Sequence, residues 1–230
     1  MLPAMVCSIQ EYQSFPAPCG AQPTGALTTI ARMDEAGAIR LTNHFLIAMP
    51  GVREEPFARS VVYVCEHSRH GALGLIINKP GELDLAGLFE RVNLPLHRAE
   101  LRHQLVLHGG PLQPERGFVL HEPIVVEGMA SDESLYASTL SIPGGVDMTT
   151  SRDVLEAISA GGGPARVLVT LGFSSWGEGQ LEGEIARNDW LTVGAAPALM
   201  FDVPVERRYE RALALLGMQA WMLTPEAGHA

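Results

Sequence analysis

The stretch RSVVYVCEHSRHGALGLIINKP, residues 59–80, contains two apolar runs on either side of a short polar segment. RSVVYVCE (59–66) alternates between two faces with the period of a β-strand, and ALGLIIN (72–78) is a second strand. The five residues HSRHG between them suit a hairpin loop in which Gly71 supplies the unusual backbone angle. Pro80 ends the second strand. The stretch therefore predicts a β-hairpin.

Further apolar runs before and after this hairpin are also typical of strands. The runs 104–108 and 117–121 are predicted to pair with each other across a loop that begins Gly109-Gly110-Pro111. The full set is HFLIAMP (44–50), QLVLH (104–108), GFVLH (117–121), LYASTLSI (135–142) and RVLVTLGF (166–173).

Four segments show the spacing or the caps of helices. Asp84 can cap the first, and Thr150 with Asp153 imitates a capping box at the second, which should end before Gly161. The other two contain GQLEGEIARN (179–188) and residues 204–216. Strands mixed with about four helices indicate an α+β fold with a mixed, largely antiparallel sheet.

Residues 1–40 differ from the rest of the chain, with four prolines and no sustained periodicity. Such a segment buries too little apolar surface to offset the entropy lost on ordering it. The sequence therefore predicts a flexible N-terminal extension over residues 1–40 and a single domain over residues 41–230, a length suited to one well-packed core.

The charge balance limits the classes of partner. The chain has 16 basic and 26 acidic residues, a net charge of −10 at pH 7, so direct binding of nucleic acid is not expected. No apolar run approaches the ~20 residues of a membrane helix, so no membrane association is expected either. Three cysteines without a secretory signal indicate a cytoplasmic protein with reduced thiols.

Cys65, His67 and His70 fall within six residues and raise the possibility of a metal site. A structural zinc site usually needs two pairs of Cys or His residues, and no second pair stands elsewhere, so no metal is predicted. GFSSWG (172–177) has Trp176 where a nucleophile elbow needs a second glycine. Neither nucleotide-binding glycine pattern occurs, so no cofactor is predicted.

Polar residues at the ends of the predicted strands form the first candidate site. A site built there would rest on a rigid sheet and would draw on His44, Glu66, His67, Asn78 and His121. The alternative is that these residues satisfy backbone groups and neighbouring loops.

A polar stripe on the third predicted helix is a second candidate. Gln180, Glu184 and Asn188 recur every four residues beside Leu181 and Ile185. Such a stripe is usually a solvated helix face, but against a sheet edge it can bind a polar ligand.

Taken together in chain order, these strings resemble the bacterial YqgE/AlgH family, whose biochemical function is not established. The resemblance covers residues 41–230 and rests on HFLIAMP (44–50), SVVYVCEH (60–67), GALGLIINKP (71–80), GGP (109–111), RGFVLH (116–121), TTSRDVLEAI (149–158), LGFSSWGEGQLEGEI (171–185), NDW (188–190) and the closing GHA.

The resemblance implies a mixed sheet bent into a barrel-like shape and flanked by helices, in a cytoplasmic bacterial protein. The AlgH name carries a link to the regulation of alginate production and, by extension, of transcription. The family pattern omits His70 and Ser174. The candidate ligand-binding residues that match the pattern are His44, Glu66, His67, Asn78, His121, Arg152, Trp176, Gln180, Glu184 and Asn188.

Three classes of function follow from these observations. The favoured hypothesis is a small-ligand-binding or regulatory domain that acts through an unknown protein or small-molecule partner. The second is an enzyme in which His67 or His121 is a general base oriented by Glu66, since a carboxylate can fix the tautomer of an imidazole. A direct DNA-binding regulator is the least favoured.

Overall fold

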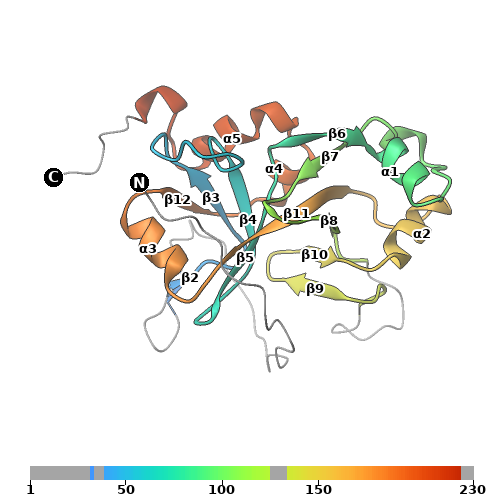
Figure 1. Ribbon diagram of the computed structural model, residues 1–230, viewed down its shortest axis with the longest axis horizontal. Helices are drawn as coiled ribbons and strands as arrows, with labels where there is room; N and C mark the ends of the chain where they lie inside the picture. The colour runs from blue at the N-terminus through green and yellow to red at the C-terminus, as the bar shows by residue number, and fades with distance from the viewer. Residues whose placement is uncertain (1–31, 34–38, 125–133, 224–230) are drawn as a thin grey trace.

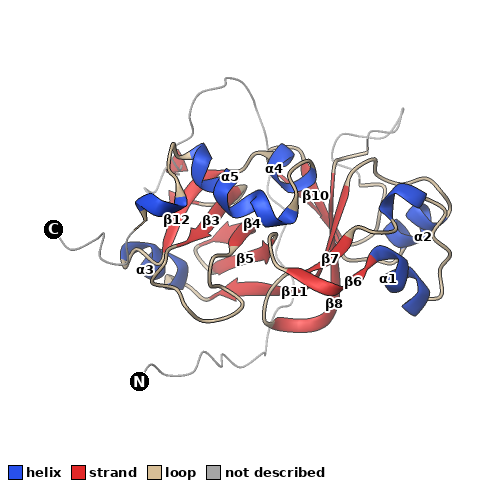
Figure 2. Ribbon diagram, turned by 90° about the horizontal axis from the view of Figure 1, so that it is seen from above, coloured by secondary structure: helices blue, strands red, loops and turns tan. Residues whose placement is uncertain are grey.

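A computed structural model describes residues 32–33, 39–124 and 134–223 of the chain. Within these residues, ten strands form one curled sheet, an open half-barrel with five α-helices around it (Figures 1 and 2). The predicted α+β fold, with a largely antiparallel sheet bent into a barrel-like shape, is confirmed. The number of α-helices in the described parts is five rather than about four.

The strands follow the order β12-β3-β4-β5-β11-β8-β10-β9, with β7 beside β11 and β6 beside β7. All pairs are antiparallel except β7 with β11. The strands are β3 (His44–Ala48), β4 (Val61–Ser68), β5 (Gly71–Ile76), β6 (Pro80–Asp84), β7 (Leu105–His108), β8 (Leu112–His121), β9 (Thr139–Ile142), β10 (Val146–Thr149), β11 (Val167–Trp176) and β12 (Trp190–Gly194).

Helices cover both faces of the sheet. Short 3-10 turns lie at Ala99–Leu101, Val205–Arg207 (η2) and Ala220–Met222. No helix among the described residues is long and apolar enough to cross a membrane. The α-helices are α1 (Leu85–Arg91), α2 (Asp153–Ser159), α3 (Gln180–Ala186), α4 (Pro197–Phe201) and α5 (Arg208–Leu215).

Strand β11 joins the two walls of the half-barrel. Its last residues pair with β5 and its first residues pair with β8, and the register shifts between Leu171 and Phe173. Gly172 lies in this bulge with φ of 74°, a conformation that favours glycine. The bulge therefore bends the sheet where one wall passes into the other.

The predicted pairing of 104–108 with 117–121 is wrong. Strands β7 and β8 lie on opposite sides of β11, because Thr170 of β11 is registered with Leu107 on one side and with Phe118 on the other. The segment Gly109-Gly110-Pro111 crosses against β11 instead of turning back. A Cβ atom at Gly109 would lie 2.3 Å from the carbonyl oxygen of Gly172, so only glycine allows this approach.

The predicted hairpin at 59–80 is present but has a shorter loop. His67 is registered with Ala72 and Ser68 with Gly71, so only Arg69 and His70 lie between the strands. Gly71 has φ of 129°, as the predicted turn requires. His67 therefore belongs to β4 and not to the loop.

Most of the helix ends predicted from the sequence are confirmed by the structure. Asp84 caps α1, its side chain accepting from the Gly87 backbone N–H at 2.8 Å. Gly217 follows α5 with φ of 70°. At α2 the expected cap at Thr150 is wrong, because Asp153 itself accepts from the Val154 N–H. Strands β6, β10 and β12 and helix α4, each of five residues or fewer, were not predicted.

Most of the predicted N-terminal extension lies outside the described residues. Within it, β1 (Arg32–Met33) and β2 (Ile39–Arg40) form an antiparallel pair, which the sequence pattern did not indicate.

Three apolar clusters hold the sheet and helices together. Phe45 and Ile47 of β3 belong to the cluster under α4 and α5, whereas Leu46 and Ala48 belong to the cluster under α3. The third cluster packs α1 and α2 against β8 and β11. Burial on both faces explains why β3 is a continuous apolar run rather than an alternating one. Helices α3 and α5 therefore cover opposite faces of the same strands.

Candidate functional site

His67 lies near the end of β4, in a hydrogen-bonded contact with α3. Its Nδ1 accepts from the Leu41 backbone N–H at 3.1 Å, and its Nε2 lies 3.0 Å from Oε1 of Glu182. A backbone N–H can only donate, so the proton of the ring is assigned to Nε2, which donates to the carboxylate. Both ring nitrogens of His67 are therefore occupied.

The two side chains of this contact differ in their exposure to solvent. The His67 side chain is 2% exposed, whereas that of Glu182 is 42% exposed. One end of the pair thus lies in the sheet and the other lies in water. Because the carboxylate is half in solvent, the pair contributes little to stability but fixes where the carboxylate points.

Glu184 accepts hydrogen bonds from two tryptophans. The indole N–H groups of Trp176 and Trp190 each donate to Oε2 of Glu184 at 2.8 Å, and the amide of Gln180 donates to Oε1 at 3.1 Å. Trp176 ends β11 and Trp190 begins β12, so one carboxylate joins two strands to α3. We call this set, together with His67 and Glu182, the α3 network.

Aromatic packing makes the α3 network rigid. The rings of Trp176 and Trp190 meet edge to face with centroids 6.2 Å apart, and Phe57 packs edge to face on Trp190 at 5.8 Å. Both tryptophans are at least nine-tenths buried. Such aromatic pairs contribute about 0.5–1.5 kcal/mol each beyond their buried area.

The three residues of the polar stripe on the third predicted helix do not share one role. Gln180 and Glu184 face the sheet and take part in the α3 network. Asn188 is exposed, has φ of 60° and follows the last turn of α3, with its N–H donating to Ile185 O at 2.9 Å. Asn188 therefore ends the helix, a role for which a left-handed Asn is suited.

His44 is connected to the α3 network through Thr42. The His44 Nδ1 donates to the carbonyl of Thr42 at 3.1 Å, while the Thr42 hydroxyl accepts from the backbone N–H of His67 at 3.0 Å. His44 is 7% exposed, and its Nε2 has no hydrogen-bond partner within the described parts of the chain.

Glu66 is next to His67 in sequence but does not orient it. A β-bulge shifts the register of β4 between Val64 and Glu66, and no hydrogen bond or ion pair of Glu66 occurs among the described residues. Burial raises the pKa of the Glu66 carboxyl, and the charge of Glu66 adds to the burial that raises the pKa of the Cys65 thiol. Glu182, and not Glu66, is the carboxylate beside His67.

The Asn78 side chain forms hydrogen bonds with the backbone at the start of β4. Its side-chain oxygen accepts from the Val61 N–H at 2.7 Å, and its side-chain amide donates to the Arg59 carbonyl at 2.9 Å. Both polar ends of this side chain therefore serve the backbone, which is the alternative that the sequence left open.

His121 lies in the opposite wall, at the end of β8. It is 1% exposed, its Nδ1 donates to the carbonyl of Glu122 at 2.8 Å, and its Nε2 lies 2.9 Å from the Thr149 hydroxyl. The Thr149 hydroxyl in turn lies 2.6 Å from that of Thr139, and the ring of Tyr136 packs edge to face on His121. We call His121, Tyr136, Thr139 and Thr149 the His121 network.

Arg152, the remaining candidate, immediately precedes α2. Its guanidinium forms an ion pair with Glu156 at 3.0 Å and donates to the carbonyl of Val92 at 3.0 Å. It therefore ties α2 to the end of α1.

The ten candidates do not form one site. His121 is registered with Val167 of β11, whereas His67 is registered with Ala72, which pairs with Trp176 of β11. Nine residues of strand separate these positions, a distance of about 30 Å at ~3.3 Å per residue. The structure gathers one group at α3, formed by His44, His67, Trp176, Gln180 and Glu184.

Glu182 was not among the candidates from the residue pattern. It is two positions from Glu184 on a helix and therefore falls outside a stripe read at four-residue spacing. Its partner His67 is 115 residues away in sequence, so local spacing could not reveal the contact. No group of three or more His, Cys, Asp or Glu side chains suited to a metal occurs within the described ranges.

The sequence matches the AlgH-like family, DUF179, over residues 45–221. The chain belongs to this family. It is 64% identical over 196 residues to a UPF0301 protein of Delftia acidovorans, covering 85% of this chain and 98% of that protein. A UPF0301 protein of Variovorax paradoxus is 61% identical over the same shares of the two chains.

Solved structures agree with the family. The solution structure of the AlgH protein from Pseudomonas aeruginosa has a TM-score of 0.65 and 44% identity, covering 86% of this chain and 100% of that one. A crystal structure of a Corynebacterium diphtheriae protein has a TM-score of 0.57 and 21% identity, covering 78% of this chain and 88% of that one, a likeness of fold alone.

Proposed function

We propose that this AlgH-like chain is a cytoplasmic binding domain that regulates partners, and that its α3 face is the contact surface. The observation that supports this proposal is the α3 network, in which buried groups hold the partly exposed carboxylates of Glu182 and Glu184 in place. A rigid polar surface of this kind favours recognition, because little side-chain entropy is lost when a partner binds.

The hydrogen bonds of His67 and His121 favour binding over general-base catalysis. A general base must present a free lone pair within about 3 Å of the proton it removes. In His67 the Nδ1 lone pair accepts from Leu41, and in His121 the Nε2 lone pair faces the Thr149 hydroxyl. Neither imidazole presents a free nitrogen to a substrate.

The chemistry of the α3 face indicates which partner it suits. Glu182 and Glu184 are acceptors, and the exposed Glu178, two residues before α3, adds a third negative charge. A partner that presents an amine or a guanidinium group would pair with them. The net charge of −10 opposes direct contact with DNA, so any effect on gene expression would pass through such a partner.

Native mass spectrometry of the chain purified from its own cells tests the proposal. We expect a bound small molecule or protein on the unaltered chain and on the control variant Glu90→Gln, an exposed position on α1. The variant Glu182→Gln should lose that species, because the amide keeps the hydrogen bond to His67 but removes the charge. A species retained by Glu182→Gln and by Glu184→Gln, or no bound species on any form, would reject the α3 face as the contact surface.

A further inference from the structure

Three arginines cluster at the start of α5 in a chain that is acidic overall. Arg207 and Arg211 are exposed and lie four residues apart along η2 and α5, so they project from the same side. Neither forms an ion pair with a residue in the described ranges. Two unpaired guanidinium groups are therefore placed side by side at the surface.

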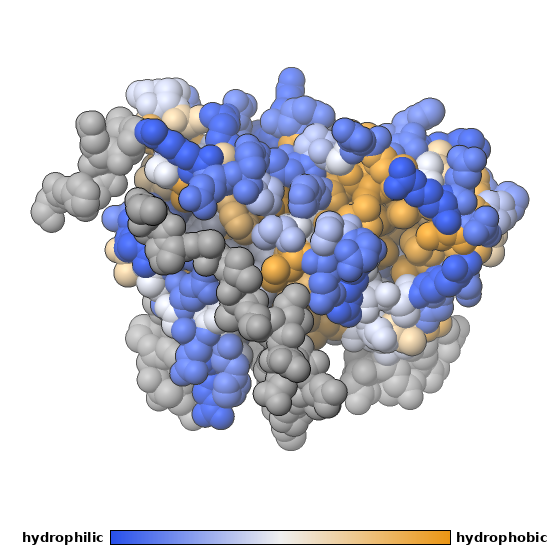
Figure 3. Space-filling model, in the orientation of Figure 1, coloured by the Kyte–Doolittle hydropathy of each residue, from blue (hydrophilic) through white to orange (hydrophobic). Residues whose placement is uncertain are grey.

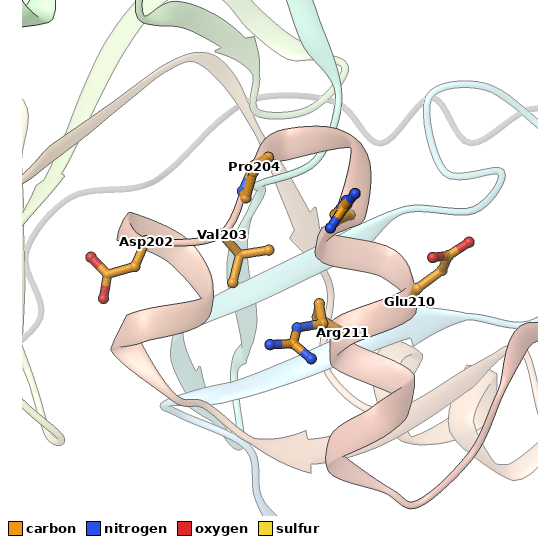
Figure 4. Close-up of a pocket in the computed structure, with 6 residues that line it drawn as sticks. Asp202, Val203, Pro204, Glu210 and Arg211 are labelled. Atoms are coloured by element: carbon orange, nitrogen blue, oxygen red, sulfur yellow. The ribbon is translucent and has the colours of Figure 1, made fainter.

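These two arginines line a hollow of about 470 Å³ between the end of α4 and α5. Its other walls are Asp202, Val203, Pro204 and Glu210. Figure 4 shows the guanidinium of Arg211 between the two acidic side chains, with Asp202 and Glu210 pointing away to opposite sides. Both oxygens of Asp202 already accept from Arg166 at 2.8 Å. The acidic residues of the rim therefore do not occupy the two arginines.

Arg208 places a third positive charge against the wall of the hollow. It is 6% exposed, and its guanidinium donates to the carbonyl of Val203 at 3.0 Å and to the carbonyl of Ile77. Both acceptors are neutral, and no carboxylate forms an ion pair with Arg208 among the described residues. Burial lowers the pKa of Arg208 to about 10, and the nearby charge of Glu206 opposes that shift only in part.

We propose that this hollow binds a phosphate group between the guanidinium groups of Arg207 and Arg211. A guanidinium presents N–H donors in a planar fork that matches the oxygens of phosphate. The volume is sufficient for inorganic phosphate or for the phosphate of a small metabolite.

The surface around the hollow agrees with a polar occupant. Hydrophilic residues cover the upper rim of the face in Figure 3, the region where Figure 1 places α5. The hollow lies on the opposite face of β3 and β4 from the α3 network. The phosphate site is therefore separate from the proposed contact surface, and variants of one leave the other intact.

Titration of the full chain with sodium phosphate, followed by ¹H–¹⁵N NMR, tests the site against sodium chloride at equal ionic strength. We expect saturable shifts at Val203, Arg207 and Arg211 with phosphate and not with chloride. The variant Arg211→Gln should weaken binding about tenfold, and Arg211→Lys should weaken it less, since charge remains but the fork is lost. Glu210→Gln should strengthen binding, because it removes a negative charge from the rim.

Arg102→Gln is the matched control, since Arg102 is exposed and forms no ion pair in the described parts of the chain. It should bind phosphate as the unaltered chain does. Equal shifts with chloride, an absence of saturation, or an equal loss in Arg102→Gln and Arg211→Gln would each overturn the proposal. A metabolite phosphate that binds more tightly than inorganic phosphate would support the site and indicate the natural source of the group.

Discussion

His67 and His121 lie toward opposite ends of β11, and both are buried with each ring nitrogen in a hydrogen bond. Their outer partners differ. His67 meets the half-exposed carboxylate of Glu182, whereas His121 meets Thr149, which is fully buried. Glu182 therefore links His67 to solvent, whereas the Thr149 hydroxyl that His121 meets is shielded from it. The difference teaches that two histidines with similar burial can differ in whether their hydrogen bonds connect them to the surface.

Gly109 lies between β5 and β11, where the two walls that carry these networks meet, and its replacement should have the largest effect on the fold. Its carbonyl accepts from Ile76 of β5 and its N–H donates to Leu171 of β11, both at 2.8 Å. A Cβ atom at this position would lie 2.3 Å from a backbone oxygen, so Gly109→Ala should lower the free energy of unfolding by about 3 kcal/mol or more. Urea denaturation measures this change.

Gly117→Ala is the control for this prediction. Nothing lies within 4 Å of a Cβ atom built at Gly117, so this variant should be as stable as the unaltered chain or more so. Equal destabilisation by both variants would show that close approach at Gly109 is not what joins the two walls.

Removing Glu184 should break the α3 network alone. Glu184→Ala leaves the buried indole N–H groups of Trp176 and Trp190 without acceptors, at an expected cost of about 2–4 kcal/mol in the free energy of unfolding. Glu184→Gln keeps one acceptor oxygen and should cost less. Chemical denaturation followed by tryptophan fluorescence gives both values, and equal costs for the two variants would contradict the role of the carboxylate as the shared acceptor.

Two threonine variants compare the fully buried partner of His121 with the partly exposed partner of the His67 backbone. Thr149→Val removes the hydroxyl that faces His121 in a fully buried position, so no water replaces it, and the expected cost is about 1–2 kcal/mol. Thr42→Val removes the hydroxyl that accepts from His67 N–H in a partly exposed position, where water can take its place. The first variant should therefore lose more stability in urea denaturation, and the reverse order would contradict the closed setting of His121.

The smallest effect is expected at Glu66. This residue is next to His67 of the α3 network but has no hydrogen-bond or ion-pair partner among the described residues. Burial raises the pKa of its carboxyl above the ordinary 4.5, so the folded state holds its proton to higher pH than the unfolded state. The contribution of Glu66 to the free energy of unfolding is therefore fully present below the pKa of the unfolded state. It is lost as the pH rises through the pKa of the folded state. Glu66→Gln should raise the melting temperature at about pH 7 and leave it unchanged at about pH 4. A gain of equal size at both pH values would mean that the charge is not responsible.

The candidate residues show how far local pattern predicts a site. Gln180 and Glu184 were recognised by their spacing on one helix, and both face the sheet. His67 and His121 were recognised by residue type at strand ends, but their separation by about 30 Å depends on strand order, which local periodicity does not encode. Glu182 lies in the family string 171–185 but was not chosen as a ligand-binding candidate, because its contact with His67 spans 115 residues of sequence.

By itself the sequence determined the α+β class, the β4–β5 hairpin, the cap at Asp84 and the end of α5 at Gly217, because periodicity, turn residues and caps act over a few residues. Only the tertiary structure decided that β11 lies between β7 and β8, and that Glu182 rather than Glu66 meets His67. The physical reason is that strand order and side-chain contacts depend on how the three apolar clusters pack together, which no short stretch of the chain contains.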